Sequence, residues 1–122
     1  MVTMTMNARK AGYIVSEEVY RSRDEGEVDH SAGTDEMESG AVLGKVTASG
    51  EWKELDPSAS DGTETAAGVL MAGIDAGATE DRTVHVRECE VDGSKLKFNS
   101  AVTTAQIATA KGQLTAAGVV VR

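Results

Sequence analysis

The stretch LDPSASDGTETAAGVL, residues 55–70, sets oxygen-bearing side chains around Gly62, directly ahead of an apolar run. Calcium loops, phosphate-binding loops and turns all use such side chains. An EF-hand is excluded, because counting from Asp56 puts the glycine one place late and leaves Ala67 at the twelfth ligand position. A weak, nonstandard calcium site stays open as an alternative. No GKS or GKT follows, so a phosphate-binding loop is not supported. The pattern favours turns, in which Asp and Ser side chains bond nearby backbone amides.

The segments around this stretch predict a sheet. Ala41–Thr47 and Glu51–Leu55 flank a short turn, which is typical of a β-hairpin. Gly68–Ile74 is an apolar run between turn signals and predicts a buried strand. Two further segments alternate apolar and polar residues on either side of Asp92-Gly93, a dipeptide favoured in tight hairpin turns: Thr83–Arg87 and Lys95–Phe98.

The last segment of the chain predicts a helix. Thr103 and Gln106 make a capping-box pair, and Gly118 is a natural terminator in the left-handed conformation. The apolar face expected between them consists of Ile107, Ala110, Leu114 and Ala117. Val119–Val121 then forms either a final strand or a tail that packs on the core. The predicted fold class is mainly β with one C-terminal α-helix.

Composition limits the classes of function. The chain has 122 residues, the size of one domain, and only 3% of them are aromatic, which favours completing a small core by oligomerisation. Its net charge of −8 disfavours nucleic acid and anionic membranes as ligands. A single cysteine excludes an internal disulfide. The N-terminus lacks the apolar core of a signal peptide, so we expect an unexported chain without a membrane span.

Charge and residue type divide the chain near Ser39. Acidic residues dominate residues 1–38, whose apolar residues are sparse, so we expect an extended N-terminal arm there and a compact domain over residues 39–122. An acidic surface loop packed on its own domain is the alternative. Residues 2–7, VTMTMN, alternate in the way of a strand that adds to an exposed sheet edge.

The residues that commonly carry chemistry give no catalytic, cofactor or metal site. His30 and His85 have no Cys or His neighbour at metal-ligand spacing, so both are expected to be solvated or structural. Cys89 lies among acidic residues that raise a thiol pKa, and we expect a small buried or edge residue. Glu88 and Glu90 fit one solvated strand face better than an acid–base pair. We therefore expect no enzyme activity and no cofactor.

In this order, the motifs resemble the head decoration proteins of lambda-like tailed bacteriophages, the D-type capsid-stabilising proteins. The matching segments are GYIVSE (12–17), SRD (22–24), SGAVLGKVTASGEW (39–52), LDPSASDGTETAAGVL (55–70), VHVR (84–87), TTAQI (103–107) and AAGVVVR (116–122). The resemblance covers about residues 11–122, and its most specific part is the AVLGKV hairpin with the stretch that follows. The family often has Trp-Pro where this chain has Phe98-Asn99, and the first ten residues extend beyond the match.

The resemblance implies a β-clip-like, mainly β fold that assembles as a homotrimer. Members of the family sit on the outer surface of the expanded capsid, bridge neighbouring capsomers and hold the shell against packaged DNA. The implied partners are the major capsid protein and further copies of the chain, with neighbouring decoration trimers as additional candidates. The implied location is the virion, after synthesis in the host cytoplasm.

Within the predicted arm, we expect Tyr13, Ile14 and Val15 to be apolar anchors and Arg21 and Arg23 to pair with capsid carboxylates. They form the only apolar cluster and the only Arg pair singled out in an otherwise acidic segment. The rival interpretations are a small β-clip-type enzyme or ligand-binding domain, and a phage tail or adhesin component.

Overall fold

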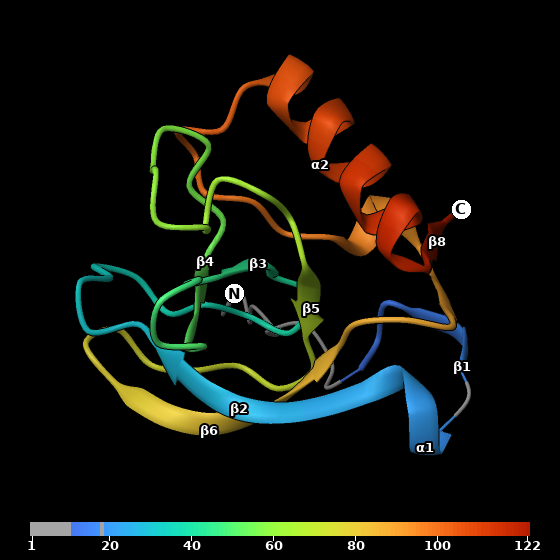
Figure 1. Ribbon diagram of the computed structural model, residues 1–122, viewed down its shortest axis with the longest axis horizontal. Helices are drawn as coiled ribbons and strands as arrows, with labels where there is room; N and C mark the ends of the chain where they lie inside the picture. The colour runs from blue at the N-terminus through green and yellow to red at the C-terminus, as the bar shows by residue number, and fades with distance from the viewer. Residues whose placement is uncertain (1–10, 18) are drawn as a thin grey trace, which may run out of the picture.

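The fold is mainly β with a C-terminal α-helix, as predicted (Figure 1). The computed structural model describes residues 11–17 and 19–122, so the strand predicted at residues 2–7 lies outside them. The elements are β1 (Ile14–Glu17), α1 (Val19–Ser22), β2 (Arg23–Asp29), β3 (Val42–Lys45), β4 (Trp52–Glu54), β5 (Gly68–Leu70), β6 (Thr79–His85), β7 (Cys89–Val91), η1 (Gly93–Lys95), α2 (Thr104–Ala117) and β8 (Val119–Val121). None of the helices in the described ranges is long and apolar enough to cross a bilayer.

Five strands close into a barrel in the order β2-β4-β3-β5-β6. The long strands β2 and β6 lie side by side in Figure 1 and pair antiparallel over seven residues, from Arg23↔His85 to Asp29↔Thr79. β3 pairs antiparallel with β4, which confirms the predicted hairpin, and with β5 on its other side. β2 also meets β4 in parallel, so the sheet has no free edge at this point.

A second sheet has the order β1-β7-β8 and lies next to α2 (Figure 1). β7 pairs antiparallel with β1 and parallel with β8. Residues 119–121 are therefore a strand, which decides between the two alternatives left open by the sequence. β1 and β8 are the two edges of this sheet.

Two groups of mainly aliphatic side chains form the core. One fills the barrel and includes Leu43, Trp52, Leu70 and Val84. The other joins the second sheet and α2 to the barrel, and its members are Tyr13, Val42, Leu55, Ala66, Val69, Cys89, Val91, Leu96, Ala110, Leu114 and Val119. Because Tyr13 lies before β1 and Val119 begins β8, this second core depends on both ends of the described chain.

The stretch at residues 55–70 folds as turns, as predicted. The Asp56 carboxylate accepts hydrogen bonds from the backbone and hydroxyl of Ser58, and Asp61 does the same for Thr63. The two hydrogen bonds from Thr63 lower the pKa of the Asp61 carboxyl. Gly62 has a φ of 110°, and a Cβ there would collide with the Lys45 carbonyl. The predicted strand that follows is shorter than expected, ending at Leu70.

The C-terminal helix has the predicted ends. The Thr103 hydroxyl accepts a hydrogen bond from the Gln106 backbone N–H, and the Gln106 side-chain oxygen accepts one from the Thr103 backbone N–H. Gly118 adopts the left-handed conformation with a φ of 101°. The buried face is narrower than predicted, because Ala110 and Leu114 are buried whereas Ala117 is exposed.

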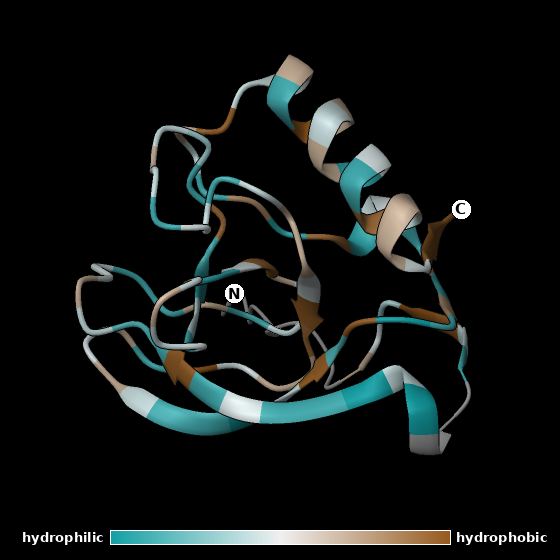
Figure 2. Ribbon diagram, viewed as in Figure 1, coloured by the Kyte–Doolittle hydropathy of each residue, from teal (hydrophilic) through white to brown (hydrophobic). Residues whose placement is uncertain are grey.

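The acidic N-terminal segment packs against the rest of the protein over its described residues, 11–17 and 19–38. The extended arm expected at residues 1–38 beside a domain at 39–122 stays a prediction. Among its described residues, Tyr13, Val28 and Met37 are buried. Figure 2 shows β2 as hydrophilic over most of its length. This strand forms because pairing with β6 satisfies its backbone groups, while Val28 supplies one fully buried side chain.

The hairpin predicted around Asp92-Gly93 is wrong. Asp92 caps the short 3₁₀ helix η1 by accepting a hydrogen bond from the Ser94 backbone. Beyond it, Leu96 is buried and Lys97 forms an isolated parallel bridge with Ala41 in place of a strand at residues 95–98. Alternation over four residues is also satisfied by an irregular segment that inserts one side chain into the core, and this is the outcome here.

Candidate functional site

Tyr13, the first predicted anchor, is a core residue. Its side chain is 2% exposed, and its hydroxyl lies 2.5 Å from His85 Nδ1 and 3.3 Å from the Val69 carbonyl oxygen. Burial, followed by the nearby Cys89 and Glu17, raises the pKa of this hydroxyl well above its usual value. Tyr13 therefore fastens the chain to its own barrel.

The two anchors that follow differ in exposure. Ile14 is partly buried and packs against the same core as Tyr13. Val15 is 56% exposed, and among the described residues it is the one large hydrophobic side chain that is exposed to solvent. Because both belong to the edge strand β1, Val15 is presented beside backbone groups that face no other strand in the described part of the chain.

The two arginines form ion pairs within the chain. Arg21 lies 3.0 Å from Glu88, and both side chains are largely exposed. Arg23 makes two hydrogen bonds to the carboxylate of Glu17, in the fork geometry that suits a guanidinium. The Arg23 bonds are the main cause of the lowered pKa of Glu17. An exposed pair such as that of Arg21 contributes little to stability, so this arginine can exchange its partner at small cost.

His85 belongs to the same cluster, although its partners cannot be identified from the sequence. Its side chain is fully buried at the end of β6, with Nε2 2.5 Å from Glu17 Oε2. Burial lowers the pKa of the imidazole below its usual value, against the opposing effect of Glu17. The histidine is structural, one of the two predicted options. Tyr13 lies 72 positions away, so no local spacing in the sequence identifies the contact.

The other histidine, His30, is also structural. It is buried, with Nε2 2.7 Å from the carbonyl oxygen of Asp35, and its ring packs on Gly33. Cys89 is buried as predicted, and burial, with a contribution from Glu17, raises the pKa of its thiol to about 11. A thiol with that pKa carries almost no thiolate at neutral pH, so Cys89 has the character of a core residue.

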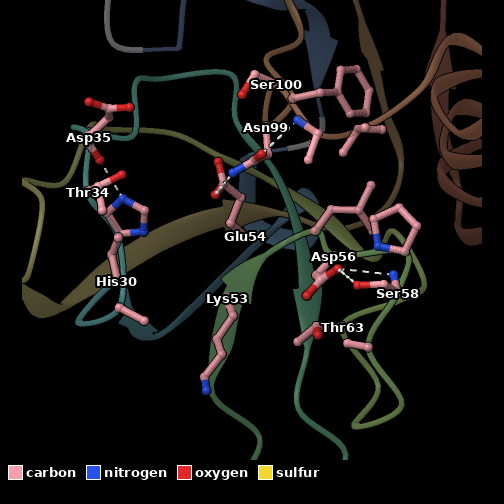
Figure 3. Close-up of a pocket in the computed structure, with 18 of the residues that line it drawn as sticks. His30, Thr34, Asp35, Lys53, Glu54, Asp56, Ser58, Thr63, Asn99 and Ser100 are labelled. Atoms are coloured by element: carbon pink, nitrogen blue, oxygen red, sulfur yellow. Dashed lines mark hydrogen bonds between the residues drawn. The ribbon is translucent and has the colours of Figure 1, made fainter.

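A groove of about 910 Å³ opens between the turn stretch, the loop after β2 and the segment before α2. In Figure 3 His30 and Asp35 lie on one side, Asp56 and Ser58 on the other, and Glu54 and Asn99 between them. Its charged lining residues are mainly acidic: Asp29, Asp35, Glu36, Lys53, Glu54, Asp56 and Asp61. The Asp56 and Asp61 carboxylates serve the local turns described above. Within the described residues no group of three or more His, Cys, Asp or Glu side chains is placed to hold a metal ion.

The comparison with protein families agrees with the order of motifs. The family model of the bacteriophage lambda head decoration protein D matches residues 3–119. This match begins before the part of the chain that carried the resemblance in the sequence. A search of curated protein sequences returned no match. Since the family match spans nearly the whole chain, the chain belongs to the family of the bacteriophage lambda head decoration protein D.

Proposed function

We propose that this protein is a trimeric cement on the outer surface of an expanded phage capsid, where it bridges capsomers and holds the shell against the pressure of packaged DNA. Family membership carries the proposal: it makes the chain a structural component of a phage head. The small aromatic-poor core supports association with further copies. A closed threefold arrangement ends growth at the trimer.

The capsid-binding segment in this proposal is the region from Tyr13 to Arg23, within the acidic stretch 1–38 that precedes the domain at 39–122. Val15 and Arg21 are the predicted residues that the free chain leaves accessible. The edge of β1 that pairs with no described strand offers backbone hydrogen bonds to an added strand of the major capsid protein. Val15 offers an apolar contact, and Arg21 offers a charge to a capsid carboxylate. Tyr13, Ile14 and Arg23 support this surface from behind through their contacts within the chain.

Three copies of this segment on one trimer make binding much stronger than one copy. After the first segment binds, the second and third bind intramolecularly, which raises avidity by factors of about 10²–10⁴. A modest contact at each Val15 therefore suffices to hold a trimer on the shell. The expected mass in solution is three times 12.7 kDa, to be measured by analytical ultracentrifugation.

Co-sedimentation with capsids tests the proposal. We expect the protein to sediment with expanded heads and to stay in solution with unexpanded ones. Val15→Ser and Arg21→Ala should each weaken binding without lowering the melting temperature. Arg122→Ala is the matched control, because Arg122 has similar exposure and also pairs with a carboxylate. Absence of binding to expanded heads would overturn the proposed function.

Deleting residues 1–24 is a poor test, since the deletion also removes Tyr13 from the core and the whole of β1. Deleting residues 1–10 separates the contribution of that segment from the contribution of β1. DNA-filled heads with and without bound protein should then be heated side by side. Release of DNA at the same temperature from both would contradict the stabilising role while leaving capsid binding intact.

A further inference from the structure

A continuous hydrogen-bonded network of polar side chains joins the N-terminal segment to the barrel. Tyr13 Oη lies 2.5 Å from His85 Nδ1, His85 Nε2 lies 2.5 Å from Glu17 Oε2, and Arg23 donates to both oxygens of Glu17. Tyr13 directly precedes β1 and Glu17 is the last residue of β1. His85 ends β6, and Arg23 begins β2. The imidazole of His85 is fully buried at the centre of this network.

The hydrogen-bond partners of His85 determine which of its ring nitrogens carries the hydrogen. The carboxylate of Glu17 can only accept, so His85 Nε2 must carry a hydrogen and donate it. A neutral imidazole then has an unprotonated Nδ1, which accepts from the Tyr13 hydroxyl. That hydroxyl has one hydrogen but two acceptors within reach, Nδ1 at 2.5 Å and the Val69 carbonyl at 3.3 Å. The hydroxyl therefore has two alternative bonding states.

We propose that the hydrogen-bonded network of Tyr13, His85, Glu17 and Arg23 is a proton-operated latch. Neutral His85 holds residues 13–17 on the barrel, and protonation of His85 loosens them. In the protonated state, Nδ1 carries a hydrogen and donates to Tyr13 Oη, and the Tyr13 hydroxyl turns to the Val69 carbonyl. Every hydrogen bond can still be made, so protonation acts through charge.

The charges that face His85 determine the direction of this effect. Among the described residues, Glu17 on β1 is the acid that pairs with the imidazole, and Arg23, directly opposite His85 in the β2–β6 pairing, already neutralises it. Tyr13, before β1, stays un-ionised at neutral pH, as does Cys89 on β7, which interacts with Tyr13 and Glu17. A proton on His85 thus adds a net positive charge to a buried site. Release of residues 13–17 hydrates the imidazolium, so the proton favours the released state.

Proton linkage has the same sign. Burial makes the pKa of His85 lower on the barrel than in the released state. The released state consequently binds more protons, and the latch is strongest above the usual histidine pKa of about 6.5 and weakens as the pH falls. The latch goes beyond the proposed function and stands without it. Only its consequence for capsid binding, through Val15 on the same strand, rests on that function.

Hydrogen exchange of the full chain, in the absence of capsids, tests the latch. Protection factors of the amides at residues 14–17, and of Asp92, which donates to the Tyr13 carbonyl, should be measured from about pH 7.5 to about pH 5. They should fall with pH by at most about tenfold per pH unit, the limit for one linked proton. Protection at Leu114 in α2 serves as the internal reference and should fall less.

The chain has two histidines, and the second gives a matched control. His85→Gln keeps a donor for Glu17 and does not titrate, so its protection factors at residues 14–17 should not depend on pH in this range. His30→Gln should behave as the unmodified protein. The latch is refuted by pH-independent protection in the unmodified protein, or by an unchanged pH dependence in His85→Gln.

If His85→Gln does not fold, imidazole NMR of the unmodified protein decides. The latch requires hydrogen on Nε2 at neutral pH and titration below the usual histidine pKa. Hydrogen on Nδ1, or titration above that pKa, would overturn it. Because no capsid is present, these results are independent of the co-sedimentation experiment, and either proposal can fail without the other.

Discussion

Tyr13 and His85 meet edge to face in the core, with ring centroids 5.4 Å apart and an interplanar angle of 85°. The contact joins residues 72 positions apart in the sequence and fastens the start of β1 to the end of β6. A segment whose composition is typical of a disordered arm thereby gains a fixed place in the fold.

The hydroxyl of Tyr13 is expected to stabilise the folded protein beyond the contribution of the ring. Tyr13→Phe should lower the free energy of unfolding by about 1–3 kcal/mol at neutral pH, because His85 Nδ1 is left buried without a donor. Urea denaturation measures the change. In a His85→Phe background the same substitution should cost much less, since both partners are then apolar. Equal costs in the two backgrounds would show that the hydrogen bond is not the cause.

Gly62 and Gly77 separate backbone strain from a steric clash. Both have positive φ values, 110° and 77°, so alanine at either position costs about 1–2 kcal/mol through strain. A Cβ at Gly62 would also lie 2.5 Å from Thr47 Oγ1, whereas a Cβ at Gly77 meets nothing within 4 Å. Gly62→Ala should therefore lower the urea midpoint clearly more than Gly77→Ala. Similar midpoints for the two variants would argue against a close packing of this turn on β3.

Gly112, in the middle of α2, is a site for stabilisation. A Cβ there meets nothing within 4 Å, and alanine is the better helix former by about 0.8–1 kcal/mol. Gly112→Ala should raise the melting temperature followed by circular dichroism. Gly118→Ala, at the left-handed end of the same helix, should lower it. A rise in both variants would mean that the helix does not end at Gly118.

Cys89 should resist thiol reagents in the folded protein. It is 4% exposed, and burial raises the pKa of its thiol to about 11, so both access and thiolate formation are suppressed. The rate of reaction with a chromogenic disulfide should be far lower in buffer than in urea. A folded protein that reacts as fast as the unfolded chain would show that β7 opens readily.

Features that depend on neighbours a few positions apart can be predicted from the sequence. The hairpin of β3 and β4, the turns at Asp56 and Asp61 and the capping box of Thr103 with Gln106 all follow from short spacings. Each is held by hydrogen bonds between residues close in the chain, so their residue types mark them directly. The order of these elements was also enough to indicate the family that the comparison then established.

Long-range packing sets the position of the described acidic residues, the parallel pairing of β7 with β8 and the partners of His85. β2 carries little apolar pattern, so nothing in its own residues indicates a strand that closes a barrel. Its pairing depends on backbone groups of β6 that lie fifty or more positions away, and backbone groups are the same in every sequence. Contacts of this kind leave no local periodicity, because the pairing is selected by the packing of the whole core.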